Sequence, residues 1–225
     1  IREHRFPYLE KVGDWNRFSE NTGGTLVEKC CHFFDLMVQI MPGRPVRVMA
    51  SGAQDVNHLD EVYDGRVPDI LDIAFVIVDF VDGGRGLLDL CMFAEATHNQ
   101  EELSVVGAKG KVEALIPEDV VRIGRRGEHW IGGVETHPVV NEEIPYEGHH
   151  SGSSWVEHQK FRDAVLGITP PEVSLFDGLL SVAIGAAGHR TRDEGRPVAL
   201  SEFLRGSASS VDHRSRHQRR GAVVR

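Results

Sequence analysis

The chain has 225 residues, of which 40% are hydrophobic and 26% charged, and its formal net charge at pH 7 is −9. This length and composition predict one globular domain with a sizeable core and exclude collagen-like, fibrous and wholly disordered proteins. No apolar run approaches the roughly 18 residues that a membrane-spanning helix needs, so we expect no membrane partner.

The two ends of the chain differ from its body. It begins at Ile1 without an initiator Met and without the apolar stretch of a signal peptide, so we expect a cut within a longer chain. The alternative is a processed or trimmed end. Residues 205–225 hold six Arg and one Asp, so this end carries +5 and the other 204 residues carry −14. Its composition predicts a basic, disordered tail, with a nucleic-acid arm as the alternative. The acidic body argues against a nucleic-acid partner.

Three cysteines are present, and Cys30 and Cys31 are neighbours. An odd count with an adjacent pair does not make a disulfide framework, and reduced thiols fit a cytoplasmic protein. Because no Cys-x-x-Cys pair exists, a thiolate zinc site is not expected.

The predicted elements begin with an irregular leading segment over residues 1–24, interrupted by Pro7, Gly13 and the Gly23–Gly24 pair. A helix is predicted over residues 26–41, where apolar residues repeat at helical spacing until Pro42 ends the pattern. Two later helices are predicted, over residues 155–166 and over residues 172–190, the second opened by Pro171.

Strands are predicted between these helices, over residues 46–52, 73–81, 87–94, 103–106, 111–116 and 120–123. Short turns join them, of which Asp82-Gly83-Gly84 is a strong hairpin signal, so consecutive strands pair antiparallel. The run over residues 73–81 is apolar on both faces, which predicts helices on one face of the sheet and a partner subunit on the other. We therefore expect an α+β fold, an open and mostly antiparallel sheet with helices on one face, in a homo-oligomer.

One polar stripe on the first predicted helix can carry chemistry. At about 100° per residue, Glu28, His32, Asp35 and Gln39 lie within roughly 60° of one another, opposite the apolar residues. Both carboxylates can then reach the imidazole, and a carboxylate that orients a His makes it a good general base near neutral pH. Two alternatives stay open. Thr25 and Glu28 have the spacing of a capping box, and a polar stripe is typical of any solvated helix.

The segment from Asn21 to Asp35 resembles the C-terminal-domain motif of the Gfo/Idh/MocA family, which includes glucose–fructose oxidoreductase and inositol dehydrogenase. That motif has a Gly pair or triplet, an apolar residue, an acid, three residues, a His and a further Asp. The order of strands and the segments 102–111, 167–178 and 188–198 also look like this family. The resemblance covers residues 6–204 or so, and it implies a domain of the dihydrodipicolinate-reductase-like type over residues 25–204.

The resemblance implies an oxidoreductase that interconverts a hydroxyl and a carbonyl on a sugar or polyol, using NAD or NADP. His32 matches the catalytic His and Glu28 its acidic partner, which is usually Asp in the family. Lys29 does not match the family's catalytic Lys, which belongs to the nucleotide-binding domain. No Gly-x-Gly-x-x-Gly follows a predicted strand, so we expect that domain, and the cofactor-binding residues, to lie outside this chain, which alone is inactive.

Further substrate contacts are predicted on this stripe, in the loop after the first strand and in later loops: Asp35, Asp55, Asn57, His58, His149, His150 and Arg17. Loops rich in Asp and Asn are also ordinary turns. Two other functions remain open. One is a non-catalytic oligomerisation or binding module derived from the same family. The other is a His-rich metal hydrolase or lyase, although we expect no metal because no His-Glu-x-x-His or similar pair is present.

Overall fold

The computed structural model describes residues 1–128, 130–142, 144–145, 148–150 and 152–204. In this part of the chain, strands join into a nine-stranded sheet of order β8-β7-β6-β5-β1-β4-β3-β2-β9. The strands are β1 Arg2–His4, β2 Pro45–Ala53, β3 Ile73–Phe80, β4 Arg85–Cys91, β5 Glu101–Gly107, β6 Gly110–Ile116, β7 Val120–Arg125, β8 Glu135–Pro138 and β9 Val198–Ala199.

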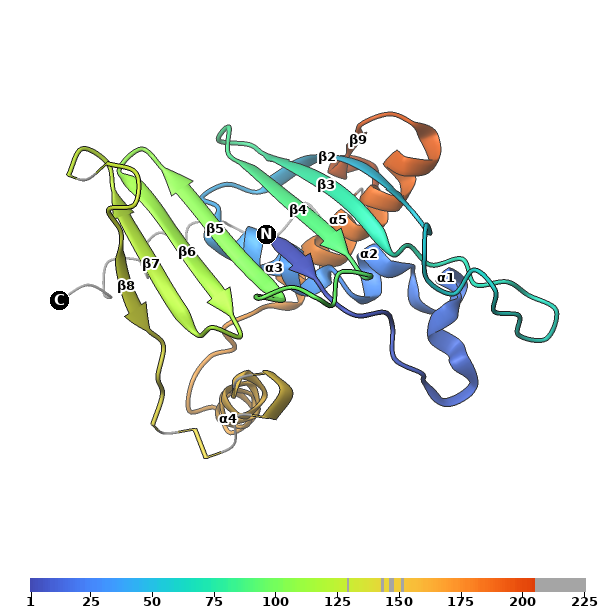
Figure 1. Cartoon of the computed structure of the whole chain (residues 1–225), viewed down its shortest axis with the longest axis horizontal. Coiled ribbons are helices and arrows are strands. Elements are labelled where there is room, and N and C mark those ends of the chain that lie inside the picture. Colours follow the sequence, from blue (N-terminus) through green and yellow to red (C-terminus); the bar gives the residue numbers. More distant parts are fainter. Residues whose placement is uncertain (129, 143, 146–147, 151, 205–225) are drawn as a thin grey trace.

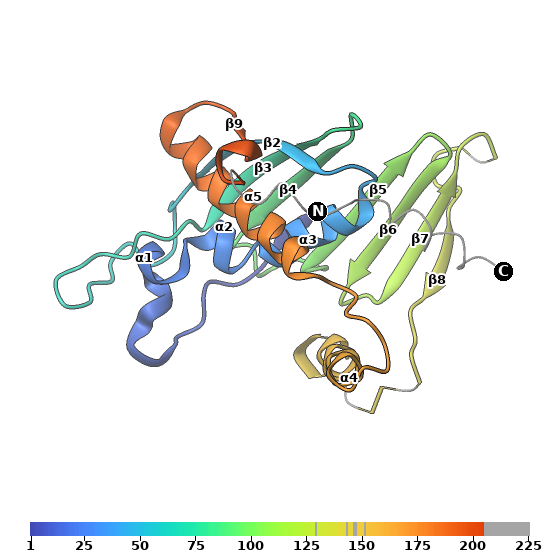
Figure 2. The same cartoon turned by 180° about the vertical axis from the view of Figure 1, so that it is seen from behind.

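The helices gather on one face of this sheet, as Figures 1 and 2 show for α2, α3 and α5 against β1 to β4. They are α1 Ser19–Thr22, α2 Thr25–Glu28, α3 Cys31–Ile40, α4 Ser153–Val165 and α5 Leu175–Glu194, with short 3-10 turns η1 Val12–Arg17, η2 Gly148–His150 and η3 Leu200–Glu202. Helix α4 lies apart from this layer, below the strands β5 and β6 in Figure 1. No helix in the described ranges is long and apolar enough to cross a membrane.

The predicted α+β fold, with a mostly antiparallel open sheet, is confirmed. All six predicted strands are present as β2 to β7, and the hairpin at Asp82–Gly84 joins β3 to β4 antiparallel. Three strands were not predicted. Residues 1–24 are not irregular throughout, because Arg2–His4 forms β1 in the middle of the sheet, parallel to β4 and antiparallel to β5. Arg2, Glu3 and His4 are all polar and carry no apolar alternation, so only the long-range pairing creates this strand. The predicted tail, residues 205–225, lies outside the described residues.

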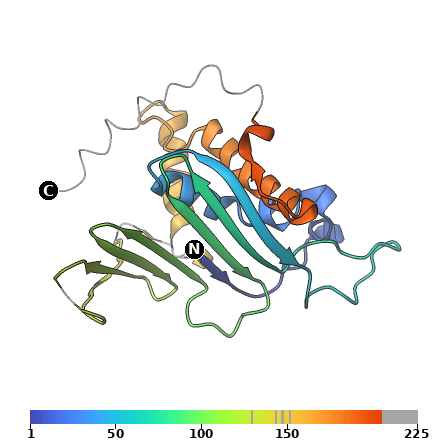
Figure 3. The same ribbon diagram turned by 90° about the horizontal axis from the view of Figure 1, so that it is seen from above.

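The two faces of β3 differ. Ala74, Val76 and Val78 are buried under the helices, whereas Phe75 and Ile77 are 48% and 40% exposed on the other face. Figure 3 shows this second face open along β2, β3 and β4. Within the described residues the helices therefore cover one face of the sheet, and the other face keeps its apolar side chains in contact with solvent.

The first predicted helix is two helices, which corrects the prediction of one helix over residues 26–41. The Lys29 and Cys30 amides both donate to the Thr25 carbonyl, at 3.0 and 3.2 Å, so the chain makes one wider turn there. The Cys30 carbonyl then accepts from the amides of Phe33 and Phe34. The apolar residues on both sides of this turn also fit the pattern of one continuous helix, so the pattern could not reveal the break.

Helix α5 packs closely on α2 because two of its residues are glycines. A Cβ on Gly185 would overlap the Leu26 carbonyl oxygen, and one on Gly188 would lie 2.8 Å from Leu26 Cδ1. The helix starts at Leu175 rather than after Pro171, because Ser174 and Asp177 form a reciprocal capping box at its first turn. Helix α5 thereby reaches both α2 and the buried side of β2.

We predict that Gly185→Ala destabilises the protein and that Gly178→Ala, in the same helix, does not. The first Cβ meets a backbone oxygen that cannot turn away, and such overpacking costs about 1–3 kcal/mol. The second has no atom within 4 Å and should stabilise the helix by up to about 1 kcal/mol. Urea unfolding measures both. Equal stability of the two variants would contradict the close approach of α5 to α2.

Candidate functional site

Helices α2 and α3 carry the predicted catalytic residues on the outer side of the helical layer. Phe33, Phe34, Met37 and Val38 turn inward and are buried, which leaves His32 exposed one turn after the half-buried Glu28. The predicted polar stripe therefore does face away from the core. An exposed imidazole on a helix that is itself packed on a sheet is accessible and held on a rigid element.

Neither predicted carboxylate hydrogen-bonds the His32 ring within the described residues. The Glu28 carboxylate interacts with the Tyr8 phenol, and burial, reinforced by Glu28, raises the pKa of Tyr8. Asp35 accepts from the Gln39 amide nitrogen at 3.3 Å. The expectation that both acids contact the imidazole assumed one continuous helix, and the wide turn after Glu28 changes the angle between these side chains.

The capping-box alternative for Glu28 is wrong. Gly24 is the N-cap of α2, and it has no side chain that could cap the helix. The Thr25 hydroxyl is buried and donates instead to the Leu71 carbonyl at 2.7 Å. This hydrogen bond connects α2 to the segment just before β3. Glu28 is thus free of a capping role, and its described contact is with Tyr8.

His189 holds the start of α2, a role that sequence reasoning missed. From α5, its Nε2 accepts the Leu26 amide proton at 3.1 Å, and a Cβ on Gly24 would overlap the same ring. Burial, followed by the nearby Arg192 charge, lowers the pKa of His189 to about 4. The ring is therefore neutral at pH 7, as an acceptor must be. His189 lies in the segment 188–198 singled out above, but its partner is 163 residues away and could not be inferred.

Arg17 and His58, two predicted substrate residues, come together around Glu61. The Glu61 carboxylate receives His58 Nδ1 at 2.7 Å, Arg17 Nε at 3.0 Å and the Tyr63 hydroxyl at 2.7 Å. Burial opposes ionisation, but the hydrogen bonds from His58, Tyr63 and Arg17 lower the pKa of Glu61 to about 2. Arg17 is buried, and His58 has a positive φ of 62° and a buried Nε2 without a hydrogen-bond partner in the described ranges. Glu61 itself was not predicted.

The loop after β2 is fixed by Asp72. Its carboxylate accepts from the amides of Asp55, Val56 and Asn57, at 2.8, 2.8 and 2.6 Å. The Asn57 side-chain amide donates to the Met92 carbonyl at 2.7 Å, whereas Asp55 is exposed. Three backbone hydrogen bonds to one buried carboxylate make this a well-defined loop at the end of β2.

The remaining predicted residues stand apart from this loop. His150 is exposed in η2, while the His149 side chain lies outside the described residues. No group of three or more His, Cys, Asp or Glu side chains that could bind a metal occurs among the described residues.

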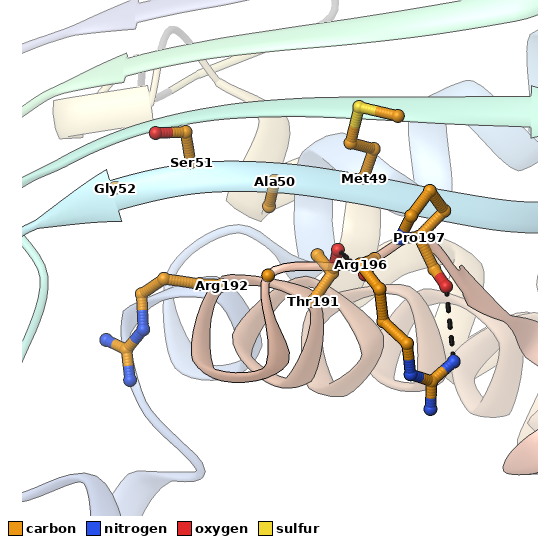
Figure 4. A pocket seen from close by; sticks show the side chains of 9 residues that line it. Met49, Ala50, Ser51, Gly52, Thr191, Arg192, Arg196 and Pro197 are labelled. Carbon is orange, nitrogen blue, oxygen red and sulfur yellow. Dashed lines mark hydrogen bonds between the residues drawn. The ribbon is translucent and has the colours of Figure 1, made fainter.

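A surface hollow of about 370 Å³ lies between β2 and the end of α5 (Figure 4). It is lined by Met49, Ala50, Ser51, Gly52, Thr191, Arg192, Gly195, Arg196 and Pro197. Arg196 donates to the Pro197 carbonyl at 3.3 Å and pairs with Glu194 and Glu202, so its charge is already compensated. The hollow includes neither Glu28 nor His32 and is not the predicted site.

Comparison with known proteins gives a consistent match. The family model of the Gfo/Idh/MocA oxidoreductases, C-terminal alpha/beta domain, matches residues 1–200. Myo-inositol 2-dehydrogenase of Thermotoga maritima is 28% identical over 192 residues, which are 81% of this chain and 51% of that protein. An oxidoreductase domain protein from Kribbella flavida has a TM-score of 0.66 at 20% identity, covering 89% of this chain and 59% of that one. GenD2 from gentamicin A biosynthesis, solved with NAD, has a TM-score of 0.60 at 24% identity, covering 88% and 54%. The chain spans about half the length of these relatives.

We predict that His189 makes the fold sensitive to acid. Its pKa is about 4 when folded, below the ordinary 6.5, so only the unfolded chain takes up this proton as the pH falls from 6.5 to 4. The contribution of neutral His189 to the free energy of unfolding is fully present above pH 6.5. It should fall by about 2–3 kcal/mol by pH 4.5. His189→Gln keeps an acceptor but cannot titrate. Urea unfolding at pH 7 and pH 4.5 should show a smaller loss in the variant, and an equal loss would contradict this role.

Proposed function

The chain belongs to the Gfo/Idh/MocA oxidoreductase family, whose C-terminal alpha/beta domain its residues 1–200 match. From this we propose that it is the substrate-binding half of an NAD(P)-dependent oxidoreductase that interconverts a hydroxyl and a carbonyl on a sugar or polyol. The observation that carries the proposal is the exposed His32 on α3, one turn after the Glu28 carboxylate. The relative named myo-inositol 2-dehydrogenase supports a cyclic polyol as substrate.

His32 is the proposed general base. When a hydroxyl carbon gives up its hydride, the hydroxyl proton must leave as well, and a neutral imidazole within hydrogen-bond reach can accept it. In the reverse direction the imidazolium returns the proton to the carbonyl oxygen. Glu28 is proposed to stabilise the imidazolium that forms, with the Tyr8 hydroxyl holding the carboxylate on this side of α2.

NAD or NADP would accept or donate the hydride. The sequence has no Gly-rich turn between a strand and a helix to receive its phosphates, so the residues of this chain do not fit the cofactor by themselves. We propose that a nucleotide-binding domain outside these 225 residues holds it, and that the chain alone is inactive. The neighbour solved with NAD supports the choice of a nicotinamide cofactor.

Substrate contacts are proposed at Asp35, Asp55, His149 and His150, of which Asp55 and His150 are exposed. The described hydrogen bonds favour a structural role for three other predicted residues, Arg17, Asn57 and His58. These side chains are already committed to Glu61 or to the Met92 carbonyl, so they would shape the loop that faces the sugar. The proposed domain over residues 25–204 then also includes β1 from the leading segment, because β1 lies inside the sheet. The free thiols Cys30, Cys31 and Cys91 support the proposed cytoplasmic location.

A second function, a non-catalytic assembly module, is favoured by the open face of the sheet. Met49, Phe75, Ile77 and Leu87 are 40–51% exposed there and stand on neighbouring strands. Such a contiguous apolar row is typical of a subunit interface, and we propose that a second copy of the chain covers it. Assembly is compatible with catalysis, so detecting an oligomer does not distinguish the two functions. The effect of removing the His32 side chain on turnover does.

We predict that His32→Ala lowers kcat of the complete gene product by roughly 10²- to 10⁴-fold, the range expected for a lost general base. His98→Ala is the matched control, because the His98 side chain is 84% exposed and its ionic partner is Glu118. Turnover is measured with myo-inositol and NAD or NADP. Wild-type turnover in the His32 variant would exclude the proposed reaction and leave the assembly module as the function.

A further inference from the structure

Glu3 is a fully buried carboxylate in the middle of the sheet. It is the central residue of β1, opposite the fully buried Leu90 of β4, and therefore points toward the helical layer. An ionised carboxylate in such a place is strongly destabilising unless cations and hydrogen bonds compensate for lost water. Its presence indicates a specific partner in the helices above it.

Two cations contact this carboxylate. Lys29 Nζ lies 3.5 Å and Arg5 Nη1 lies 3.4 Å from the same oxygen, Oε1, and both side chains are largely buried. The second oxygen, Oε2, has no hydrogen-bond partner in the described part of the chain. Burial raises the pKa of Glu3, while Lys29 and Arg5 lower it. Arg5 follows Glu3 on the same segment, so Lys29 is the cation that connects the sheet to the helices.

Lys29 stands at the break between α2 and α3. It follows Glu28 directly and is the C-cap of α2, while α3 begins two residues later at Cys31. The hydrogen bonds of the wide turn start here, with the amides of Lys29 and Cys30 sharing one carbonyl. The ammonium group also lies 5.9 Å from the ring centroid of Phe33, which adjoins His32. The side chain that reaches the sheet is thus the one between the two proposed catalytic residues.

We infer that the ion pair between Glu3 and Lys29 fixes the break between α2 and α3 and so sets the relative direction of Glu28 and His32. Lys29 is then a positioning residue that acts through the backbone. A buried ion pair need not add stability, but it does select one geometry when its two charges meet only in that arrangement. The catalytic meaning of this geometry rests on the proposed function, whereas the fixing of the break does not.

The test removes both charges together with Glu3→Gln and Lys29→Met, so that no single buried charge remains. In the 225-residue chain, amide hydrogen exchange of Lys29, Cys30 and Phe33 should become faster, while exchange of Ile184 in α5 stays unchanged. In the complete gene product, kcat should fall roughly 10- to 100-fold with little change in KM, as for a misplaced catalytic group. Lys29→Arg, which keeps the charge, should restore most of the turnover.

Arg5→Met is the matched control, because it removes the other cation of Glu3 without touching the break. Its exchange at Lys29, Cys30 and Phe33 should match the wild type. Should the double variant not fold, Lys29→Met alone serves for the same comparison, since Arg5 still compensates Glu3.

Unchanged exchange at the break in the variant that lacks Lys29, or an equal acceleration in Arg5→Met, would overturn the inference. Faster exchange at the break together with wild-type turnover in the His32→Ala variant would instead refute the proposed function and leave the positioning role intact.

Discussion

The backbone of Leu26 is the point on which the arrangement of this molecule depends. Its carbonyl faces Gly185, where any side chain would overlap it, and its amide donates to His189 one turn further along α5. Both backbone polar groups of this buried residue therefore lie against a single helix. Because α5 also packs on the sheet, α2 has one position over β1 to β4. The direction in which the Glu28 side chain points from the end of α2 is thereby fixed as well.

On the side of the helices that faces the sheet, an ion pair fixes their position more narrowly than apolar packing does. The apolar core between sheet and helices would accept small sliding motions of α3, because Leu, Val and Phe contacts have little directional preference. A carboxylate on the central strand that meets an ammonium group from the break has a much narrower range. The open side of α3, with His32, is thus supported by directional interactions at its base, while the loops around Asp72 and Glu61 are built from polar networks of their own. The proposed acid–base residues stand on helices, and the loops around Asp72 and Glu61 hold several of the proposed substrate residues.

The strands from β2 to β7 were predictable because each has alternating or continuous apolar residues between clear turns. The position of β1 was not, since its three residues are polar and its neighbour β4 comes more than eighty residues later. The polar stripe with Glu28 and His32 was visible in the helical period, but the break at Lys29 was not, because it depends on Glu3 across the core. Arg17 and His58 were both named as candidates, yet only the fold reveals Glu61 as the group that joins them. Sequence periodicity predicts which face of a helix or strand is buried, but it does not predict which residues of distant segments contact that face.

The central claim is that a polyol binds beside His32 on the outer side of the helical layer. Side-chain NMR of the 225-residue chain during titration with myo-inositol tests it most directly, because every histidine ring reports separately. We predict that the His32 resonances move with increasing polyol while those of His98 and of the half-buried His189 stay in place. The largest changes at another position, such as the hollow beside Arg196, or no change at His32, would contradict it.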